Sequence, residues 1–394
     1  MHTSNALTGI RVLDLSRILA GPSATQLLGD LGADVVKVER PLEGDDTRKW
    51  GPPYIKDTSG KPTGESAYYL AANRNKRSIA IDIASPEGSG LVHRLLNRAD
   101  VLVENYKAGG LAKYGLAYDQ LKEKYPSLIY CSITGFGQTG PYAKRPGYDF
   151  LAQGMGGIMS ITGEPDGQPM KLGVGIADIM TGMYAAVGIL AALQHRHATG
   201  HGQHIDISLL DTQVSWLVNA GTNYLADRQL PPRLGNGHPN IVPYQVFSTL
   251  DYPMILAVGN DSQFRRFCEV AGLPELASDD RYATNIMRIL HREQLCGLIE
   301  DRLKTRQRLS WLDELEAAGV PSGPVNNLAQ VFEDPQVKAR GGELRMPCEW
   351  AEGGEIGLLA NPLHMSRTPP TYQRPPPRLN EHEADVLAGW LGDR

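Results

Sequence analysis

Residues 9–40 read GIRVLDLSRILAGPSATQLLGDLGADVVKVER, and this stretch indicates the class of fold. Two short runs of apolar and β-branched residues, VLDL and DVVKV, read as strands, and the segment between them reads as a helix. Pro22 stands where a helix start accepts a residue without an N–H, and Gly29 and Gly32 end the helix before the second strand. The stretch therefore predicts a parallel strand–helix–strand unit.

The same alternation continues along the chain to about Gly135. Three further runs, RSIAIDI, ADVLVEN and SLIYCSITGF, read as strands separated by helical segments. A long apolar stretch with many small residues at 179–193 predicts a buried helix, and the turn ATGHGQ leads from it into an alternating strand, HIDISLLD. We therefore expect an α/β fold with a Rossmann-like parallel sheet.

At 394 residues the chain is longer than a single core usually fills, so we expect more than one domain. We predict a large Rossmann-like domain at 1–210, which binds the ligand and carries catalysis, and a linker at 211–232. A smaller α+β domain at 233–325, with amphipathic helices rich in Arg, Glu and Leu, follows. Residues 326–394 are expected to return and pack on the large domain, with their proline-rich run RTPPTYQRPPPR extended.

The composition argues against several classes of function. The formal net charge is -5 and the pI is about 6.1, so the chain lacks the electrostatic footprint of a protein that binds nucleic acid or an anionic membrane. The four cysteines are widely separated and lack zinc-ligand spacing, which predicts no metal site and a reducing compartment. We find no signal-peptide pattern and no apolar run approaching the roughly 20 residues of a membrane span, so we expect a cytoplasmic protein.

The opening stretch imitates a dinucleotide-binding fingerprint, because a strand, a glycine-bearing turn, a helix and a second strand ending in Glu39 follow one another. The fingerprint requires G-x-G-x-x-G so that the backbone can approach a pyrophosphate. Here the turn offers Ala20, Gly21 and Pro22 instead. A plain strand–helix–strand unit explains these residues better than a nicotinamide dehydrogenase does.

Several cations follow predicted strand ends or lie in loops, namely Arg40, Lys76, Arg77, Lys107 and Lys113. At the carboxyl ends of parallel strands, cations are where a phosphorylated ligand docks. Taken singly, each of these residues is more often a solvated surface charge. Taken together, the two interpretations have about equal support.

Asp178 is a lone acid in the apolar stretch KLGVGIADIMTGMYAAVGILAAL. Burial costs a charged group dearly unless something compensates it, and the start of a helix offers unpaired N–H groups and a partial positive charge. Asp178 therefore reads either as the N-cap of the helix or as a nucleophile held ionised by it. The pattern alone does not decide between the two.

Two glycines, Gly235 and Gly237, lie in the loop RLGNGHPNIVPYQVF. Glycines allow backbone N–H groups to point at a ligand, which is how an oxyanion or a thioester carbonyl is held. A flexible loop between domains explains the same residues equally well.

These segments, in this order, resemble the class III CoA-transferases. This CaiB/BaiF-type family includes formyl-CoA and carnitine-type CoA-transferases and the α-methylacyl-CoA racemases. The resemblance covers nearly the whole chain, and it is carried by VLDLSRILAGP, LGADVVKVER, NRNKRSIAIDI, VENYKAGGLAKYGL, SITGFGQTGPY, IADIMTGMYAAVGILAAL, HATGHGQHIDISLLD, GNGHPNIVPYQVF and AGVPSGPVNNLAQVFEDPQ.

The resemblance implies that Asp178 is the catalytic nucleophile, with Tyr148 and Asp149 in supporting roles. It implies that the backbone of Gly235 and Gly237 lies over the reacting acyl group. The residues that it assigns to coenzyme A are Leu19 and Ala20, which would flank the thioester, and Arg40, Lys76, Arg77, Asn105, Tyr106 and Lys113. No tightly bound cofactor is implied, because CoA arrives as part of the substrate. The family also implies an interlocked homodimer.

The resemblance further implies a reaction path. The Asp178 carboxylate would attack an acyl-CoA to give a mixed anhydride and then an aspartyl-CoA thioester, from which a second carboxylic acid takes the CoA. The family members most like this chain favour succinyl-CoA as donor and a small carboxylic or dicarboxylic acid as acceptor. Arg233, near the glycines, is a candidate partner for a distal carboxylate, with a surface role at least as well supported.

Two other functions fit the same fold. A racemase of this family has a histidine where Tyr148 stands, and a tyrosine with an ordinary pKa near 10 is a poor acid–base group at neutral pH, so transfer is favoured. A non-catalytic acyl-CoA-binding protein is disfavoured because Asp178 and the glycine loop are both present.

Overall fold

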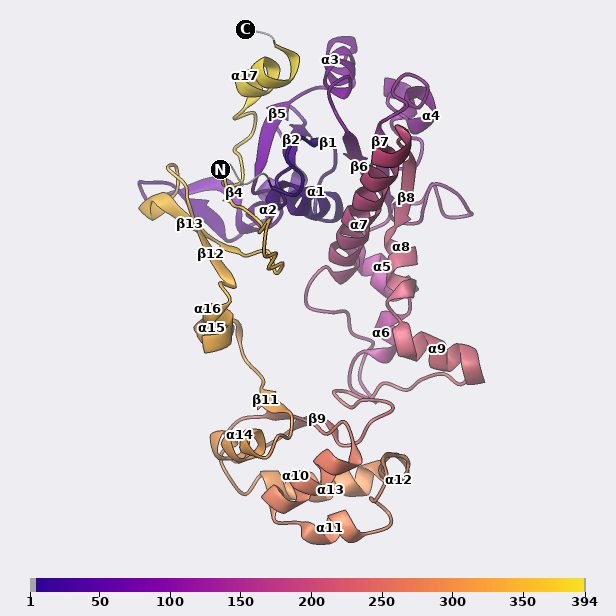
Figure 1. Cartoon of the computed structure of the whole chain (residues 1–394), viewed down its shortest axis with the longest axis vertical. Helices are drawn as coiled ribbons and strands as arrows, with labels where there is room; N and C mark the ends of the chain where they lie inside the picture. Colours follow the sequence, from indigo (N-terminus) through magenta and orange to yellow (C-terminus); the bar gives the residue numbers. More distant parts are fainter. Residues whose placement is uncertain (1–4, 393–394) are drawn as a thin grey trace. The chain divides into compact units, whose positions relative to one another are not determined.

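The structure is a computed structural model that describes residues 5–392, and its chain divides into two compact units. The larger unit contains the chain up to Ile158, Lys171–Arg228 and the chain from Pro335 onward. The smaller unit contains Met159–Met170 and Gln229–Asp334. Figure 1 traces the elements of both units along the chain.

The larger unit is built on a six-stranded parallel sheet in the order β5-β2-β1-β6-β7-β8. The strands are β1 Arg11–Asp14, β2 Asp34–Glu39, β5 Lys76–Ala80, β6 Val101–Glu104, β7 Ile129–Thr134 and β8 His204–Ser208. The central strands are apolar and buried almost throughout, as expected for a parallel sheet covered on both faces. The predicted α/β fold with a Rossmann-like sheet is confirmed.

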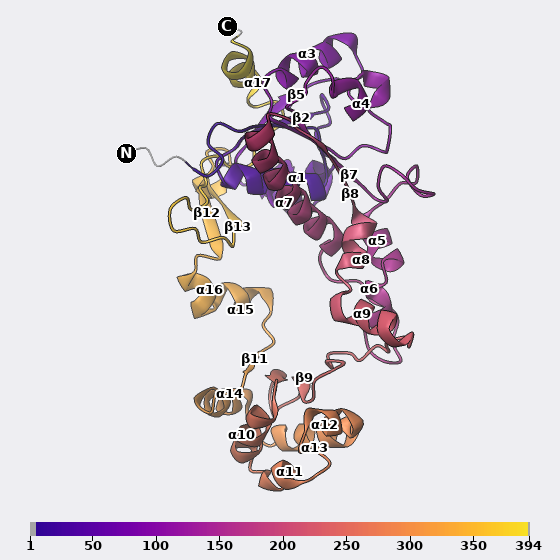
Figure 2. The ribbon, with the colours of Figure 1, turned by 45° about the vertical axis from the view of Figure 1, so that its right-hand side comes forward.

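Helices cover both faces of this sheet. Alternate strand residues point to opposite faces, so Leu13 packs in one core and Val12 in the other. The first core includes α3 Pro86–Leu96, α4 Tyr118–Leu121 and α17 Glu383–Val386. The second includes α1 Ala20–Asp30 and α7 Ile176–Thr199, which pack against each other, and Figure 2 shows these two helices side by side.

The remaining elements of the larger unit lie around this layered centre. They are η1 Asp46–Lys49, the hairpin β3 Tyr54–Lys56 with β4 Pro62–Ser66, α2 Ala67–Leu70, η2 Ala112–Tyr114, α5 Asp149–Met155, the first residue of α6 Ile158–Ile161, α16 Pro335–Ala339, η3 Glu352–Gly354, the hairpin β12 Glu343–Pro347 with β13 Glu355–Leu359, and η4 Leu387–Leu391. The proline-rich run has neither helix nor strand, and its backbone hydrogen-bonds to Asp30 and Asn75 of the larger unit.

The smaller unit is an α+β structure with its own core, as predicted. Its antiparallel sheet, in the order β11-β10-β9, consists of β9 Tyr244–Phe247, β10 Met254–Ala257 and β11 Ser322–Pro324. Its helices are α10 Asp261–Ala271, α11 Pro274–Ser278, α12 Asn285–Leu290, α13 Arg292–Leu303, α14 Arg308–Ala317 and α15 Leu328–Glu333. Phe264, Phe267 and Trp311 lie at the centre of its core.

Two segments differ from the sequence predictions. The chain at 211–227, which we predicted to be part of a linker, forms α8 Leu209–Ser215 and α9 Val218–Asp227. The side chain of Ser208 caps α8 by accepting the N–H of Asp211, so a helix begins directly after β8. Helix α7 is also long and apolar enough to span a membrane by length and composition, which we had excluded. Its packing against α1 and the sheet gives it a place in the core of the larger unit.

Candidate active site

Asp178 lies in the first turn of α7, which begins at Ile176 with Gly175 as its N-cap. The N-cap interpretation of Asp178 is therefore wrong, because Asp178 is the third residue of the helix. Its side chain is half-buried. A carboxylate at this position does not cap the helix, so it is available for another partner.

Asp149, the first residue of α5, supplies the cap instead. Its Oδ2 accepts the backbone N–H groups of Ala177 at 2.8 Å and of Asp178 at 3.2 Å. These are two of the N–H groups that a helix start leaves without partners. The other oxygen, Oδ1, accepts the side-chain amide of Gln153 at 2.6 Å, and Gln153 in turn accepts the N–H of Leu172 at 2.9 Å. Asp149 and Gln153 thus fix the chain on both sides of Gly175.

The same arrangement changes the charge behaviour of Asp178. Burial and the negative charge of Asp149 raise the pKa of Asp178 to about 7. Among the described residues no cation pairs with it, so the expectation that the helix start keeps it fully ionised is wrong. A half-buried carboxylate that titrates near neutral pH is suited to act as a nucleophile or a base.

Two aromatic residues that the sequence analysis did not single out lie near this acid. Burial and the charges of Asp178, Asp149 and Asp45 raise the pKa of Tyr68, which places these carboxylates within electrostatic reach of its hydroxyl. The ring of Trp50 meets the ring of Tyr68 edge-on, with centroids 5.2 Å apart. Trp50 follows the short 3-10 helix η1 and Tyr68 belongs to the four-residue helix α2, and segments this short carry no periodic pattern that marks a site residue. Tyr148, the N-cap residue of α5, is 60% exposed.

A pocket of about 330 Å³ lies at the carboxyl ends of β1, β2 and β6, which is where we predicted that a phosphorylated ligand docks. It is lined by Leu15, Ser16, Arg17, Lys37, Val38, Glu39, Arg40, Gly44, Asp45, Tyr106, Lys107, Gly110, Lys113 and Tyr114. Three residues assigned to CoA, Arg40, Tyr106 and Lys113, are among them. Arg17 was missed, although it follows the end of β1 by three residues, and a cation after a strand end is the signal that selected Arg40 after β2.

The pocket is rich in cations. Arg17 pairs with Asp46 and Arg40 with Glu43, and all four of these side chains are largely exposed. The Lys113 ammonium lies 4.7 Å from the centre of the Tyr114 ring. Such exposed pairs are weak, so an anionic ligand can replace the carboxylates. The lining therefore suits a phosphorylated ligand.

Lys76 and Arg77 do not line this pocket, so the pocket does not support their assignment to CoA, which stays a prediction. They begin β5 and so stand at the amino end of a strand. Lys76 is fully buried and donates to Asp14, to the carbonyl of Pro22 and to Asn73 at 3.2, 2.9 and 3.0 Å. Arg77 pairs with Asp34 at 2.7 Å. Both cations neutralise acids of the fold.

The other residues assigned to CoA have structural contacts. The side chain of Asn105 accepts the N–H of Arg17 at 3.0 Å and donates to its carbonyl at 2.7 Å. Leu19 and Ala20 are buried at the start of α1. The Leu19 Cδ2 atom lies 3.2 Å from where a Cβ on Gly175 would stand, so the start of α1 touches the turn that precedes Asp178.

Gly235 and Gly237 belong to the smaller unit, whereas Asp178 belongs to the larger. The N–H of Gly235 donates to the carbonyl of Gly163 at 3.0 Å, and the N–H of Gly237 donates to the carbonyl of Leu234 at 2.8 Å. We predicted that both N–H groups point at a ligand, but both are bonded within the smaller unit. The physical reason for Gly235 is a turn at 163–170 of the same unit, and for Gly237 it is a turn within its own loop.

Arg233 holds this turn as well. Its guanidinium donates to the carbonyls of Glu164, Pro165 and Gly167 at 3.1, 3.2 and 2.6 Å. These bonds use its Nε and Nη2 groups, so Arg233 has a structural role in the smaller unit, and its pairing with a substrate carboxylate stays a prediction.

In the described part of the chain, no three or more His, Cys, Asp or Glu side chains gather as they would around a metal ion. The cationic pocket, the half-buried acid and the aromatic pair are the chemical features of the larger unit that require explanation.

Comparison with known proteins gives consistent results. The model of CoA-transferase family III matches residues 7–383. The chain is 53% identical to the succinate–glutarate CoA-transferase of Agrobacterium fabrum, over 97% of this chain and 95% of that protein. It is 43% identical to the human succinyl-CoA:glutarate CoA-transferase, over 98% and 86%. A crystal structure of a CaiB/BaiF family protein from Brucella suis is similar, with a TM-score of 0.86 and 50% identity over 98% of this chain and 100% of that one.

Proposed function

Because the chain belongs to CoA-transferase family III, an enzyme family whose relatives here transfer CoA to dicarboxylic acids, we propose that it moves CoA from succinyl-CoA to glutarate or a dicarboxylate of similar length. The predicted enzyme class is thereby confirmed. The choice of donor and acceptor rests on the names of the two glutarate-using relatives and on the site described above.

We propose Asp178 as the nucleophile, and the observation that carries this step is its pKa of about 7 in a half-buried position, where none of the described residues places a cation beside it. Such a carboxylate is ionised in useful amounts at neutral pH and is less well solvated than one in water, which favours attack. Asp149 orients it by holding the N–H groups of Ala177 and Asp178.

The proposed path runs through two mixed anhydrides and one thioester on Asp178. The Asp178 carboxylate attacks the thioester carbonyl of succinyl-CoA, the C–S bond breaks and CoA leaves as a thiolate, giving a mixed anhydride. The thiolate attacks the Asp178 carbonyl, succinate leaves and an aspartyl-CoA thioester forms. The acceptor carboxylate then attacks the carbonyl of this thioester, CoA leaves as a thiolate and a second mixed anhydride forms. The thiolate attacks the acceptor carbonyl of that anhydride, which gives the new acyl-CoA and releases the Asp178 carboxylate.

The cationic pocket supplies the CoA site of this proposal. Coenzyme A carries a diphosphate and a 3′-phosphate, and Arg17, Arg40, Lys107 and Lys113 present positive charge at one edge of the sheet. Leu19 touches Gly175, which connects the start of α1 with the turn before Asp178, and a thioester beside Leu19 and Ala20 is consistent with that contact.

A homodimer is also part of the proposal. Helix α7 exposes a row of large apolar side chains, and α5 exposes others. These residues are Met183, Tyr184, Val187 and Leu190 on α7 and Phe150, Leu151 and Met155 on α5. An apolar surface of this kind on a long helix favours contact with a second copy of the chain. Light scattering with size-exclusion chromatography should give twice the monomer mass, and a monomer at micromolar concentration would contradict it.

The function is tested by incubating the enzyme with succinyl-CoA and a panel of dicarboxylates and following new acyl-CoA masses. We expect glutaryl-CoA to form, and hydroxylamine to trap an adduct on Asp178 that mass spectrometry locates. D178N should lose at least a thousandfold in rate, whereas D119N, a change at an exposed acid, should retain full activity. Deuterium uptake at an α-carbon without transfer would instead indicate a racemase, and neither signal would indicate a binding protein.

A further inference from the structure

The turn between β1 and α1 contains a residue in a strained backbone conformation. Ile18 has a φ of 72°, in the left-handed region that β-branched residues avoid. Such strain persists only where the surroundings hold the chain firmly, and it clusters at functional sites. The contacts that hold this turn therefore require explanation.

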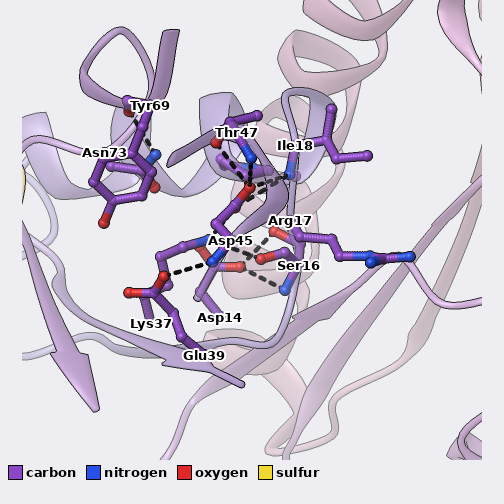
Figure 3. Close-up of polar contacts among 12 residues, drawn as sticks. Asp14, Ser16, Arg17, Ile18, Lys37, Glu39, Asp45, Thr47, Tyr69 and Asn73 are labelled. Atoms are coloured by element: carbon purple, nitrogen blue, oxygen red, sulfur yellow. Dashed lines mark hydrogen bonds and ion pairs between the residues drawn. The ribbon is translucent and has the colours of Figure 1, made fainter. Parts of the chain in front are cut away.

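Asp45 is the main contact of the strained residue. Both of its carboxylate oxygens accept the N–H of Ile18, each at 3.2 Å. The Lys37 ammonium donates to Asp45 at 2.9 Å and to the carbonyl of Ser16, also at 2.9 Å. Figure 3 shows this group of side chains beneath the turn. The side chains of Lys37 and Asp45 are each only 1% exposed, so water does not loosen the pair.

Other contacts fix Asp45 and the turn independently. The carboxylate of Asp45 accepts the N–H of Thr47 at 3.0 Å and its hydroxyl at 2.8 Å, and the N–H of Asp45 donates to Glu39 at 2.9 Å. On the other side of the turn, Asn105 holds both the N–H and the carbonyl of Arg17. Every residue from Ser16 to Ile18 thus has a backbone group bound by a side chain from another segment.

The turn joins the two parts of the proposed active site. Ser16 and Arg17 line the cationic pocket. Leu19, directly after the strained residue, begins α1 and reaches the position of Gly175, the N-cap of the helix that carries Asp178. A shift of the turn therefore moves the pocket lining and the residue beside the nucleophile together.

We propose that Asp45 is a positioning residue for CoA transfer, which holds Ile18 in its strained conformation so that the bound thioester and the Asp178 carboxylate are correctly aligned. This inference rests on the proposed function. Asp45 does not react with substrate. It acts through the backbone of the turn, and misplacement by about 1 Å is enough to slow a reaction about a hundredfold.

The first test compares D45N with the double variant K37M/D45N. The asparagine keeps the size of the side chain but has one acceptor oxygen where the aspartate has two. We expect kcat of D45N, per folded enzyme, to fall at least tenfold, with KM for succinyl-CoA within threefold of the wild type. D45N also leaves the Lys37 ammonium buried without its partner, so its melting temperature should fall. K37M/D45N removes that charge together with the bond to the carbonyl of Ser16, and its melting temperature should rise above that of D45N while kcat stays low.

Three outcomes overturn the proposal. An unchanged kcat with a lower melting temperature assigns Asp45 a structural role only. A raised KM with an unchanged kcat assigns it to binding. Recovery of both kcat and melting temperature in K37M/D45N shows that the charge, and not the turn, controlled the rate. If the wild type forms neither glutaryl-CoA nor a thioester on Asp178, the proposed function itself fails, and the two failures are distinguishable.

The second test uses I18G and I18A as a matched pair and remains informative if D45N does not fold. Both variants remove the Ile18 side chain, but only glycine accepts a φ of 72° without strain. We expect I18G to melt at a higher temperature than I18A, because glycine carries no strain at this φ. We also expect I18G to transfer CoA at least threefold more slowly than I18A, because its turn moves more freely. Equal or faster transfer by I18G would contradict the role of the strained turn.

Discussion

Two groups of carboxylates in the larger unit differ in what faces them. Beside β1 and β2, Asp14 and Asp45 are buried next to Lys76 and Lys37. At the start of α7, Asp178 faces another acid, Asp149, and no cation pairs with it among the described residues. We refer to the first group as the paired cluster and to the second as the acid pair.

The difference appears in the direction of the pKa shifts. Burial opposes the ionisation of Asp14, but Lys76, Lys37 and hydrogen bonds from Ser16 and Thr25 hold its pKa below the ordinary value. Burial and Asp149 act in the same direction on Asp178 and raise its pKa to about 7. Burial alone therefore does not mark a reactive acid. What marks one is burial without a compensating cation.

Breaking the paired cluster should have the largest effect on stability. K76M leaves Asp14 buried without the ammonium that it contacts at 3.2 Å, and also removes the bonds to Pro22 and Asn73. We expect the free energy of unfolding to fall by about 3 to 5 kcal/mol, measured by urea denaturation. The matched control is K122M, which breaks the exposed pair with Asp119 and should change nothing measurable. If K76M and K122M lost equal free energies of unfolding, the buried pair of Lys76 and Asp14 would contribute no more to stability than the exposed pair of Lys122 and Asp119.

A second variant tests the packing of α1 on α7, which lies between the paired cluster and the acid pair. Helices α1 and α7 approach closely at Gly182, where a Cβ would lie 2.6 Å from the carbonyl of Ala20. G182A should therefore push the helices apart and cost about 1 to 3 kcal/mol in thermal or urea unfolding. G188A, at a site where the Cβ would meet Ile205 at 3.4 Å, should be neutral or slightly stabilising. A stable and fully active G182A would show that the contact between the helices is not critical.

The acid pair should be a site where function costs stability. The pKa of Asp178 in the folded protein, about 7, lies above its value in an unfolded chain, so the folded state binds the proton more tightly. Stability contributed by this group is therefore complete below about pH 4 and is lost as the pH rises toward 7. D178N does not ionise, so it should be more stable than the wild type by about 1 to 2 kcal/mol at pH 8. The difference should vanish at pH 4, and a difference that grows toward acid would contradict the assignment.

The smallest expected change concerns the pH profile of the reaction. D149N removes the negative charge that raises the pKa of Asp178 while keeping an oxygen that can accept the N–H groups of α7. Because the pKa of Asp178 then falls, the acid limb of the pH profile of kcat should move to lower pH by on the order of one unit. Steady-state rates between pH 5 and 9 measure it. A limb that stays in place would show that burial alone raises the pKa of Asp178.

The sequence predicted the architecture well, because strand–helix alternation depends on short-range patterns. Apolar runs bounded by turn residues form all six strands of the parallel sheet, so these strands could be predicted from the sequence. The resemblance to the family also indicated the enzyme class and Asp178. Arg40, Tyr106 and Lys113 lie at one pocket, as the carboxyl ends of parallel strands meet at one edge, and their binding of CoA stays a prediction.

Several site predictions went beyond what a linear pattern contains. Lys76 and Arg77 resembled exposed phosphate ligands, but Arg77 pairs with Asp34 of the neighbouring strand β2, and Lys76 pairs with Asp14 of β1, the next strand beyond it. The N–H groups of Gly235 and Gly237 were expected to face a ligand, but carbonyls at Gly163 and Leu234 accept them. In each case the partner lies on another segment or depends on the shape of a turn.

What the sequence by itself determined is the six strands of the parallel sheet, the long helix α7 and the apolar setting of Asp178, because each depends on neighbouring residues and hydrophobic periodicity. What only the tertiary structure decided is the partner of each buried charge. Asp45 meets Ile18 from 27 positions away, and Asp149 meets Ala177 and Asp178 from 28 and 29. Coulomb energies depend on distance and burial in space, so these contacts, and not position in the chain, separate the acids of the fold from the acid proposed to react.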